Sequence, residues 1–400
     1  MPFTTRATPL ALHIRQQTGR RKISNSHSRV SVVYLLGAGA SFGKRISKAE
    51  EIKADKNHGI ITFINPTAPA YKITEGLPIV TEIPERIGYI IKKLETIQLA
   101  ELSEKTILPL GQFGGMGVTS AREMFIKDLK WLQEECASHA TIDTFAKKLW
   151  LKKEFKLYKK VECLLAIYFI IEQIINKPDN RYDTFLANIL TSQLTIPNEI
   201  RIVTWNYDSQ FEIAYKEYLD DKLDKDLTTN LRLISRGDSI PPFFNPSIFK
   251  INGSATFREM RSLGAFCGKG ADQELTESIL IELLNYYVIS LDKDNNSCKL
   301  SFAWEDDSEK NKQYWLNLKG NTQDAVSLVV IGYTFPFFNR NIDRTLFDAM
   351  KNLKTIYIQD PNAENLIQNI RPVLSDRHSQ TKIIPLTNVD QFYLPAELSI

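Results

Sequence analysis

Five short polar or glycine-rich segments, each directly after an apolar run that predicts a strand, contain the residue types best suited to chemistry. Glycines let a backbone approach a pyrophosphate closely, and an amide can hold a ribose hydroxyl or a water. A carboxylate can stabilise positive charge that develops on a sugar. The five segments are Gly37-Ala38-Gly39-Ala40-Ser41, Asn206-Tyr207-Asp208, Asn252-Gly253-Ser254, Gly332-Tyr333-Thr334-Phe335-Pro336 and Asp360.

Each segment also has a simpler structural interpretation. A Gly-x-Gly turn after a strand is often only a tight packing turn, and Asp208 could cap the helix that follows it. The phenylalanines around Pro336 could pack in the core instead of against a base. A hydride-transfer dehydrogenase would add a second strand ending in Asp or Glu about 20 residues after the first turn. The sequence around Asp55 has no such strand, which argues against that class.

The elements that must position these segments are strands alternating with helices. Short runs rich in Val, Ile and Leu predict buried strands, and helical periodicity follows most of them. Repeated strand–loop–helix units predict an α/β fold, with a parallel sheet and helices on both faces. In such a sheet the ligand lies beyond the carboxyl ends of the strands, so we expect the segments to converge on one nucleotide pocket. The first turn is expected to open a helix. The predicted strands are 30–36, 200–205, 248–251, 327–332 and 354–358.

A long helical stretch separates the first predicted strand from the second. It begins near Ile83 with Pro84 in the first helical turn, a favoured position for proline. Apolar residues then recur at spacings of three and four. We predict an inserted helical subdomain at 83–195 and a nucleotide-binding core formed by 30–82 and 196–400.

The N-terminal segment differs in charge from the rest of the chain. Residues 1–49 carry nine Lys and Arg and no acidic residue, although the formal net charge of the whole chain is only +3. That total is too small to indicate nucleic-acid binding by itself. Residues 1–29 have the composition of a transit peptide, and an oligomerisation arm, a nucleic-acid arm or an over-long start are alternatives. We expect a disordered or interaction arm.

The overall composition excludes several classes of protein. Hydrophobic residues make up 43% of the 400 residues and charged residues 24%, as in soluble globular chains with a sizeable core. The four cysteines contain no Cys-x-x-Cys pair, so neither a disulfide framework nor a structural zinc site is expected. A reducing cytoplasm fits this spacing best. No apolar run reaches the roughly 18–20 residues that a membrane span needs.

The order of these segments resembles that of the sirtuin motifs, and more closely the bacterial sirtuin-like proteins of anti-phage defence. The resemblance covers about 30–372 and is densest at the turns. Three further strings resemble that family: Thr204-Trp-Asn-Tyr-Asp208, Phe302-Ala-Trp-Glu305 and Ile331-Gly-Tyr-Thr-Phe-Pro-Phe-Phe-Asn-Arg340.

The resemblance implies a Rossmann-like core that binds NAD⁺ as a substrate, with no metal, and hydrolyses it to nicotinamide and ADP-ribose. Asn206 would hold the nicotinamide ribose and the attacking water, and Asp208 would lie near the nicotinamide amide. Asp360 would accept hydrogen bonds from the adenine ribose. The pyrophosphate would be held by Gly37, Ala38, Gly39 and Ser41, the adenosine side lined by Gly332, Tyr333, Thr334 and Phe335, and the pocket completed by Phe42, Gly76, Pro78 and Trp205.

Three departures from the family pattern argue against protein deacylation. Asn252-Gly253 stands where the family usually has His-Gly, and Gly76-Leu-Pro78 is followed by Ile79-Val80 instead of Phe-Arg. The paired-cysteine zinc module is missing. Asn252 can hydrogen-bond a ribose hydroxyl, but it cannot take a proton near neutral pH.

No histidine lies in the five segments to replace the missing one. His139 precedes the string Thr141-Ile-Asp143-Thr-Phe145, which also resembles the family, and we expect a surface or capping role for it. Asp143 is of greater interest, and its simpler role would be to cap a helix.

The expected function is therefore a sirtuin-like NAD⁺ glycohydrolase that acts as an abortive-infection effector. Because unregulated NAD⁺ loss would kill the host, control should come from homo-oligomerisation or from a partner such as a translocase-type ATPase or an Argonaute. The alternative is a non-catalytic subunit that binds NAD⁺ or ADP-ribose, which Asn252 favours. Direct nucleic-acid binding through the basic arm is a weaker third hypothesis.

Overall fold

The computed structural model describes residues 32–47, 71–110, 114–219, 227–241, 244–258, 260, 274–291, 298–302, 304–305 and 309–398. The predicted N-terminal arm at 1–29 lies outside these residues, as does the segment around Asp55.

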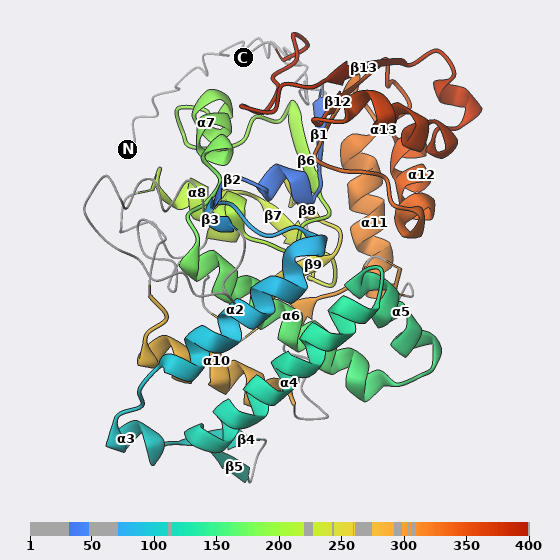
Figure 1. The fold of residues 1–400 in the computed structure, drawn as a ribbon. Coiled ribbons are helices and arrows are strands. Elements are labelled where there is room, and N and C mark those ends of the chain that lie inside the picture. Colours follow the sequence, from blue (N-terminus) through green and yellow to red (C-terminus); the bar gives the residue numbers. More distant parts are fainter. Residues whose placement is uncertain are drawn as a thin grey trace, which may run out of the picture.

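A seven-stranded parallel sheet forms the centre of the molecule (Figure 1). This confirms the predicted α/β class, and the architecture is Rossmann-like. The order across the sheet is β13-β12-β11-β1-β6-β8-β7. The five predicted strands are present, and the sequence did not predict β7 or β13. The strand bounds are β1 Val32–Leu36, β6 Ile200–Thr204, β7 Leu233–Ser235, β8 Ile248–Lys250, β11 Ser327–Ile331, β12 Thr355–Gln359 and β13 Lys382–Leu386.

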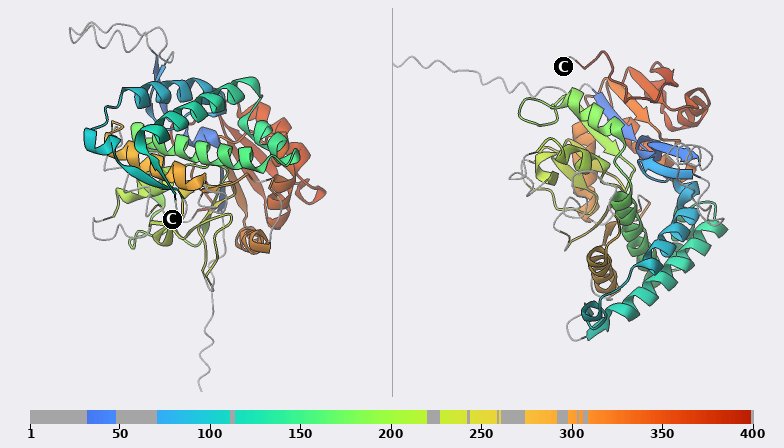
Figure 2. Two further views of the ribbon diagram at one scale, coloured as in Figure 1. Left: turned by 90° about the horizontal axis from the view of Figure 1, so that it is seen from below. Right: turned by 60° about the vertical axis from the view of Figure 1, so that its left-hand side comes forward.

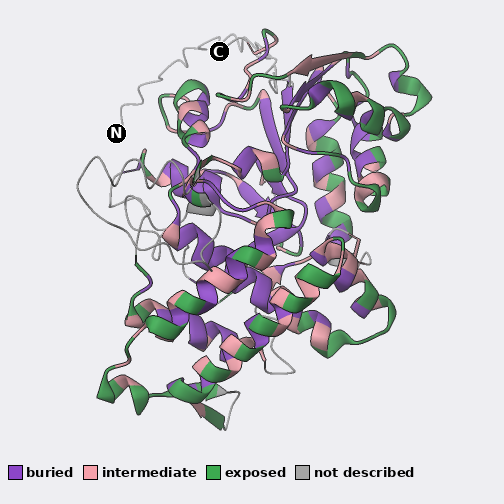
Figure 3. Ribbon diagram, viewed as in Figure 1, coloured by how far each residue is buried: buried purple, intermediate pink, exposed green. Residues whose placement is uncertain are grey.

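Helices cover both faces of the sheet, as predicted. Helices α11 (Glu309–Thr322), α12 (Arg340–Ala349) and α13 (Ala363–Ile370) pack on one face. Helices α7 (Asn180–Ile189) and α8 (Gln210–Lys216) pack on the other, together with apolar side chains near the C-terminus. All residues of β1, β6 and β11 are buried, which explains their largely apolar sequences (Figure 3). The polar exceptions are Arg201, Thr204 and Ser327, which are buried as well.

The chain reverses its direction of travel across the sheet at β1. It runs from β1 through β6 to the edge strand β7, places β8 between β6 and β7, and then returns to place β11 on the other side of β1. The carboxyl ends of β1 and β11 therefore form a topological switch point, the position at which ligands bind in open α/β sheets.

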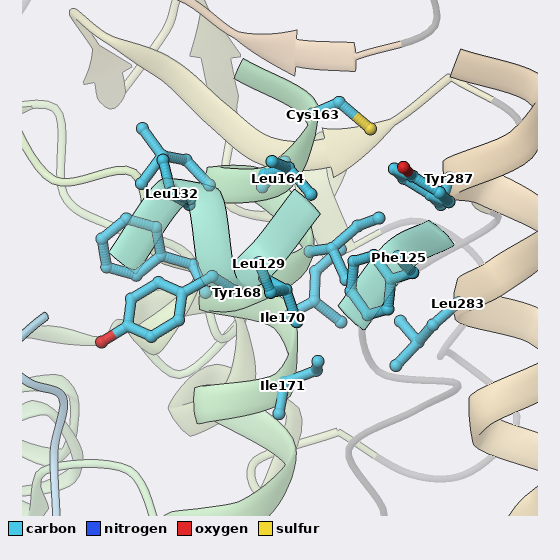
Figure 4. Packing of buried hydrophobic residues seen from close by; sticks show 14 of the residues in the cluster. Phe125, Leu129, Leu132, Cys163, Leu164, Tyr168, Ile170, Ile171, Leu283 and Tyr287 are labelled. Carbon is cyan, nitrogen blue, oxygen red and sulfur yellow. The ribbon is translucent and has the colours of Figure 1, made fainter. Parts of the chain in front are cut away.

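A second hydrophobic core lies within a group of helices that we call the helical subdomain. Its members are α2 (Ile83–Thr96), α4 (Val118–Ser138), α5 (Ile142–Leu151), α6 (Phe155–Ile175) and α10 (Glu277–Ser290). Helices α2 and α4 run side by side (Figure 2), and Phe125 of α4 meets Tyr287 of α10 with ring centroids 5.0 Å apart (Figure 4). Helix α10 belongs to this core although it lies after residue 195, and α7 packs on the sheet although it lies before residue 195. Hydrophobic packing therefore divides the chain differently from the predicted boundaries.

The remaining elements are three two-stranded pairings and several short helices. Strand β2 (Lys44–Ser47) pairs with β3 (Tyr71–Glu75), β4 (Ile107–Leu110) with β5 (Gly114–Gly117), and β9 (Gly253–Phe257) with β10 (Cys298–Leu300). The short helices are η1 (Ala38–Ser41), η2 (Val80–Glu82), α3 (Glu101–Glu104), α9 (Leu227–Asn230), η4 (Phe337–Asn339), η5 (Arg371–Val373) and η6 (Asp376–His378).

One local prediction is wrong. The turn after β1 does not open an α-helix, because η1 is a single 3-10 turn and the chain then enters β2. Gly43 lies between them at a φ of +62°. This left-handed backbone ends the turn and lets β2 pair with β3. Among the described helices, none combines the length and apolar character needed to cross a membrane.

Candidate functional site

Two glycine turns pack backbone against backbone at the switch point. The N–H of Gly39 donates to the carbonyl of Gly332 at 3.0 Å, and Gly332 has a φ of +58°. A Cβ on Gly332 would lie 2.4 Å from the Cα of Gly39, and one on Gly37 would lie 2.6 Å from the oxygen of Gly332. These close approaches explain the glycines by turn-to-turn packing, which brings the predicted pyrophosphate and adenosine segments together.

A third predicted segment lies directly against the first turn. Leu77 donates its N–H to the carbonyl of Ser41 at 2.6 Å. Gly76 has a φ of +78°, and a Cβ there would lie 2.5 Å from the same oxygen. Gly76 and Pro78 are both buried. In this structure they belong to the backbone segment that packs against the first turn.

The hydroxyl of Ser41 connects three parts of the chain. It donates to Oδ2 of Asp208 at 2.8 Å, lies 2.8 Å from the phenol oxygen of Tyr182, and accepts from Nδ2 of Asn206 at 3.1 Å. Ser41 is only 2% exposed. The sequence predicted three of these four residues but not Tyr182, because an aromatic residue on the amphipathic helix α7 resembles any core residue.

The side-chain amide of Asn206 is held in one orientation. Its Nδ2 donates to the carbonyl of Gly37 at 3.0 Å and to Ser41, which uses both amide hydrogens. Its Oδ1 accepts no hydrogen bond from any of the described residues. Asn206 therefore offers an oriented acceptor at the carboxyl edge of the sheet, next to the switch point.

Asp208 is buried and serves partly as a structural residue. In addition to Ser41, it accepts from the backbone N–H of Gln210, the first residue of α8, at 3.1 Å. This bond forms an Asx turn at the start of α8, whose N-cap residue is Ser209. Burial raises the pKa of Asp208, and the nearby ammonium of Lys250 opposes that rise.

Lys250 is a site residue that the sequence did not reveal. It ends β8 and is 2% exposed, and its Nζ lies 2.6 Å from both the carbonyl of Asp208 and Oε1 of Glu212. A buried ammonium needs such partners. The sequence signal that could have identified Lys250 is its position in an otherwise apolar strand, two residues before Asn252.

Asn252 connects the ends of two strands. Its Nδ2 donates to the carbonyl of Trp205 at 2.8 Å, and its own carbonyl accepts from Ser301 at 3.0 Å. The following Gly253 has a φ of +67°, and a Cβ there would lie 2.1 Å from the carbonyl of Lys299. Asn252 thus has a clear structural role.

Aromatic side chains pack together next to the candidate site, near the end of β11. Trp205 stacks on Tyr333 with ring centroids 5.5 Å apart and an interplanar angle of 9°. Tyr333 donates to Asp343, with its hydroxyl 3.0 Å from both carboxylate oxygens. Asp343 is completely buried, and burial raises its pKa to about 8. Phe335 packs edge-on against Tyr333 at 4.9 Å, as a core residue would.

The remaining predicted residues lie outside this buried network. Ala38 and Thr334 are exposed, and the ring of Phe42 lies 3.6 Å from the guanidinium carbon of Arg45. Asp360 accepts from the backbone N–H of Asn362 at 2.8 Å, in the turn that leads into α13.

Several further predicted residues have local roles. Phe337 and Phe338 are exposed, and the guanidinium of Arg340 lies over Phe337 at 4.7 Å. His139 follows α4 and packs against Phe145, with ring centroids 4.8 Å apart and an interplanar angle of 43°. Within the described part of the chain, no three His, Cys, Asp or Glu side chains are grouped as metal ligands would be.

The string 302–305 lies where the edge of the sheet meets the helical subdomain. Glu305 accepts a hydrogen bond from Tyr158 of α6 and lies 3.5 Å from Arg236, which follows β7. Arg236 also donates to the carbonyl of Phe302. These contacts connect α6 to the carboxyl end of the sheet.

Comparison with protein-family models and with curated proteins finds no match to this chain. The sirtuin-like assignment remains a prediction from the motifs.

Proposed function

We propose that this chain is a sirtuin-like NAD⁺ glycohydrolase, which cleaves NAD⁺ to nicotinamide and ADP-ribose. The observation that supports it most is the amide of Asn206, held next to the switch point with both hydrogens bonded internally. Its Oδ1 can accept from a ribose hydroxyl or from the attacking water. A fixed acceptor at this position requires no reorganisation during the reaction.

The chemistry suits a site that positions its substrate and stabilises charge. Cleavage of the glycosidic bond passes through a sugar with oxocarbenium character, so nearby carboxyl groups favour it. The turns that contain Gly39 and Gly332 meet beside Asn206 and would contact the dinucleotide from both sides of the switch point.

The biological setting that we propose rests on the motif resemblance. The chain would act in the cytoplasm as an abortive-infection effector, controlled by homo-oligomerisation or by a translocase-type ATPase or an Argonaute.

A second candidate is a non-catalytic subunit that binds NAD⁺ or ADP-ribose. The bond from Asn252 to the carbonyl of Trp205 favours it, because this side chain replaces a proton-accepting histidine and holds two loops together. In this case the pocket would bind the nucleotide without cleaving it.

The test is nicotinamide release from NAD⁺ by the purified chain over hours, beside Asn206→Ala and a control, Asn188→Ala. Asn188 is exposed on α7, and its Nδ2 donates to the carbonyl of Thr184 on the same helix. We expect release by wild type and the control and none by Asn206→Ala, with melting temperatures showing that all three are folded.

Other outcomes separate the two candidates. An inert wild type whose melting temperature rises with NAD⁺ supports the binding subunit. If NAD⁺ is not cleaved and does not change the melting temperature, both proposals are contradicted.

A further inference from the structure

One carboxyl of the helical subdomain reaches the loops at the carboxyl end of the sheet. Asp143 is the second residue of α5, and the hydroxyl of Tyr207, which follows β6, donates to its Oδ1 at 3.3 Å. Burial raises the pKa of Tyr333, which follows β11, and the charge of Asp143 adds a smaller rise. Asp143 therefore lies near the ends of both strands that flank β1.

Capping does not account for Asp143. The cap of α5 is Thr141, whose side-chain oxygen accepts from the N–H of Thr144 at 3.1 Å. Among the described residues, no lysine or arginine forms an ion pair with Asp143. Its carboxyl thus faces the strand ends with a phenol as its only side-chain partner in this part of the chain.

Three other carboxyls near the ends of β6 and β11 are already engaged. Asp208 binds Ser41 and the start of α8, Glu212 binds Lys250, and Asp343 is completely buried beneath Tyr333. Asp143 is only half-buried. It is therefore the carboxyl among these four that can meet a water molecule without breaking an internal ion pair or cap.

We propose that Asp143 is the general base of the hydrolysis, supplied to the site by the helical subdomain. This proposal rests on the proposed function. The bond between the ribose anomeric carbon and the nicotinamide nitrogen breaks, and its electron pair stays with nicotinamide. A water oxygen bonds to that carbon, and its proton passes to the carboxylate of Asp143 and then to solvent. The products are nicotinamide, ADP-ribose and one proton.

The surroundings of Asp143 suit a base. Burial raises its pKa, while the hydrogen bond from Tyr207 opposes the rise. A pKa closer to neutrality makes a carboxylate a better proton acceptor.

Among the described residues, the charged and titratable groups that act on Asp143 or on its partner Tyr207 come from the sheet loops and from α5. Tyr207 and Tyr333 face it from the sheet, and the charges of Glu305 and Arg236 act on Tyr207. On its own helix, Lys147 is directed over the ring of Trp304.

The experiment compares Asp143→Asn with Asp183→Asn in the full chain. Asp183 is a matched control, because it lies in the first turn of α7 and accepts a bond from the hydroxyl of Tyr218 at 2.8 Å. We expect Asp143→Asn to lower kcat by about 10²–10⁴-fold. It should also abolish the decline of kcat at low pH, yet keep the rise in melting temperature with NAD⁺. Asp183→Asn should match wild type.

A second variant tests the base without removing it. Tyr207→Phe deletes the hydrogen bond that opposes the raised pKa of Asp143, so the acidic limb of the pH–kcat profile should move to higher pH. Wild-type kcat and an unchanged pH profile in both variants overturn the assignment of Asp143 and leave the hydrolase standing. A wild type that releases no nicotinamide overturns both.

Discussion

The hydroxyl of Ser41 donates to Oδ2 of Asp208 at 2.8 Å, although 167 positions separate the two residues. Both are buried, at the ends of neighbouring strands β1 and β6. The bond joins the glycine turn to the loop that carries Asn206. The geometry of the candidate site therefore depends on one short side chain.

Replacing Ser41 with alanine should destabilise the protein and impair the site. The change leaves the buried oxygens of Asp208 and Tyr182 each without one partner, which costs about 1–3 kcal/mol. Urea denaturation measures the loss. Ser379→Ala at an exposed position is the control, and equal midpoints for the two variants would contradict the role of Ser41.

Two glycines should respond to alanine in opposite directions. Gly332→Ala places a Cβ 2.4 Å from the backbone of Gly39 at a φ of +58°, so we expect a loss of at least about 2 kcal/mol. Gly320→Ala, within α11, meets nothing within 4 Å and should gain about 0.5–1 kcal/mol. Thermal unfolding of both variants tests the turn-to-turn packing, and a stable Gly332→Ala protein would refute it.

Asp343 should make stability depend on pH. Its pKa is raised from 3.8 to about 8 by burial, so the folded state binds the proton more tightly than the unfolded chain. Its contribution is most favourable below pH 3.8 and is lost as pH rises to about 8. Asp343→Asn has no carboxyl to ionise at this position, so this pH-dependent loss of stability should be absent from the variant.

The stability of the Asp343→Asn variant relative to wild type should increase by several kcal/mol between pH 4 and pH 8. Denaturation curves across that range provide the measurement. Asp348→Asn, exposed on the same helix, should show no such trend. A difference between Asp343→Asn and wild type that stays constant with pH would show that Asp343 is ionised throughout.

The helical subdomain contains a buried ion pair between α2 and α6. Arg86 donates to both carboxylate oxygens of Glu172, at 2.9 and 2.8 Å. Arg86→Leu leaves a buried charge without its partner, at a cost of about 3–5 kcal/mol. Lys130→Ala, which removes an exposed pair with Glu95, should cost less than about 1 kcal/mol. Comparable losses in the two variants would argue against a special role for the buried pair.

Local pattern was enough to place most of the elements and the turns that form the candidate site. The apolar runs of β1, β6 and β11 predicted buried strands, and the glycines at 37, 39 and 332 predicted the turns. Pattern failed where a partner far along the chain decides the outcome. After the 3-10 turn that follows β1, the chain forms β2 instead of an α-helix, because β3 pairs with β2. Lys250 is a site residue only because the carbonyl of Asp208 and the carboxylate of Glu212 meet it.

The sequence by itself determined the class of fold, because alternating apolar strands and amphipathic helices bury their apolar surfaces only as a parallel sheet between helices. It also placed the polar segments after the strands. Only the tertiary structure decided that β11 lies beside β1, that Asn252 holds Trp205, and that Asp143 of α5 reaches Tyr207. Strand order and these contacts depend on hydrogen bonds and packing between residues distant in sequence, which local periodicity does not specify.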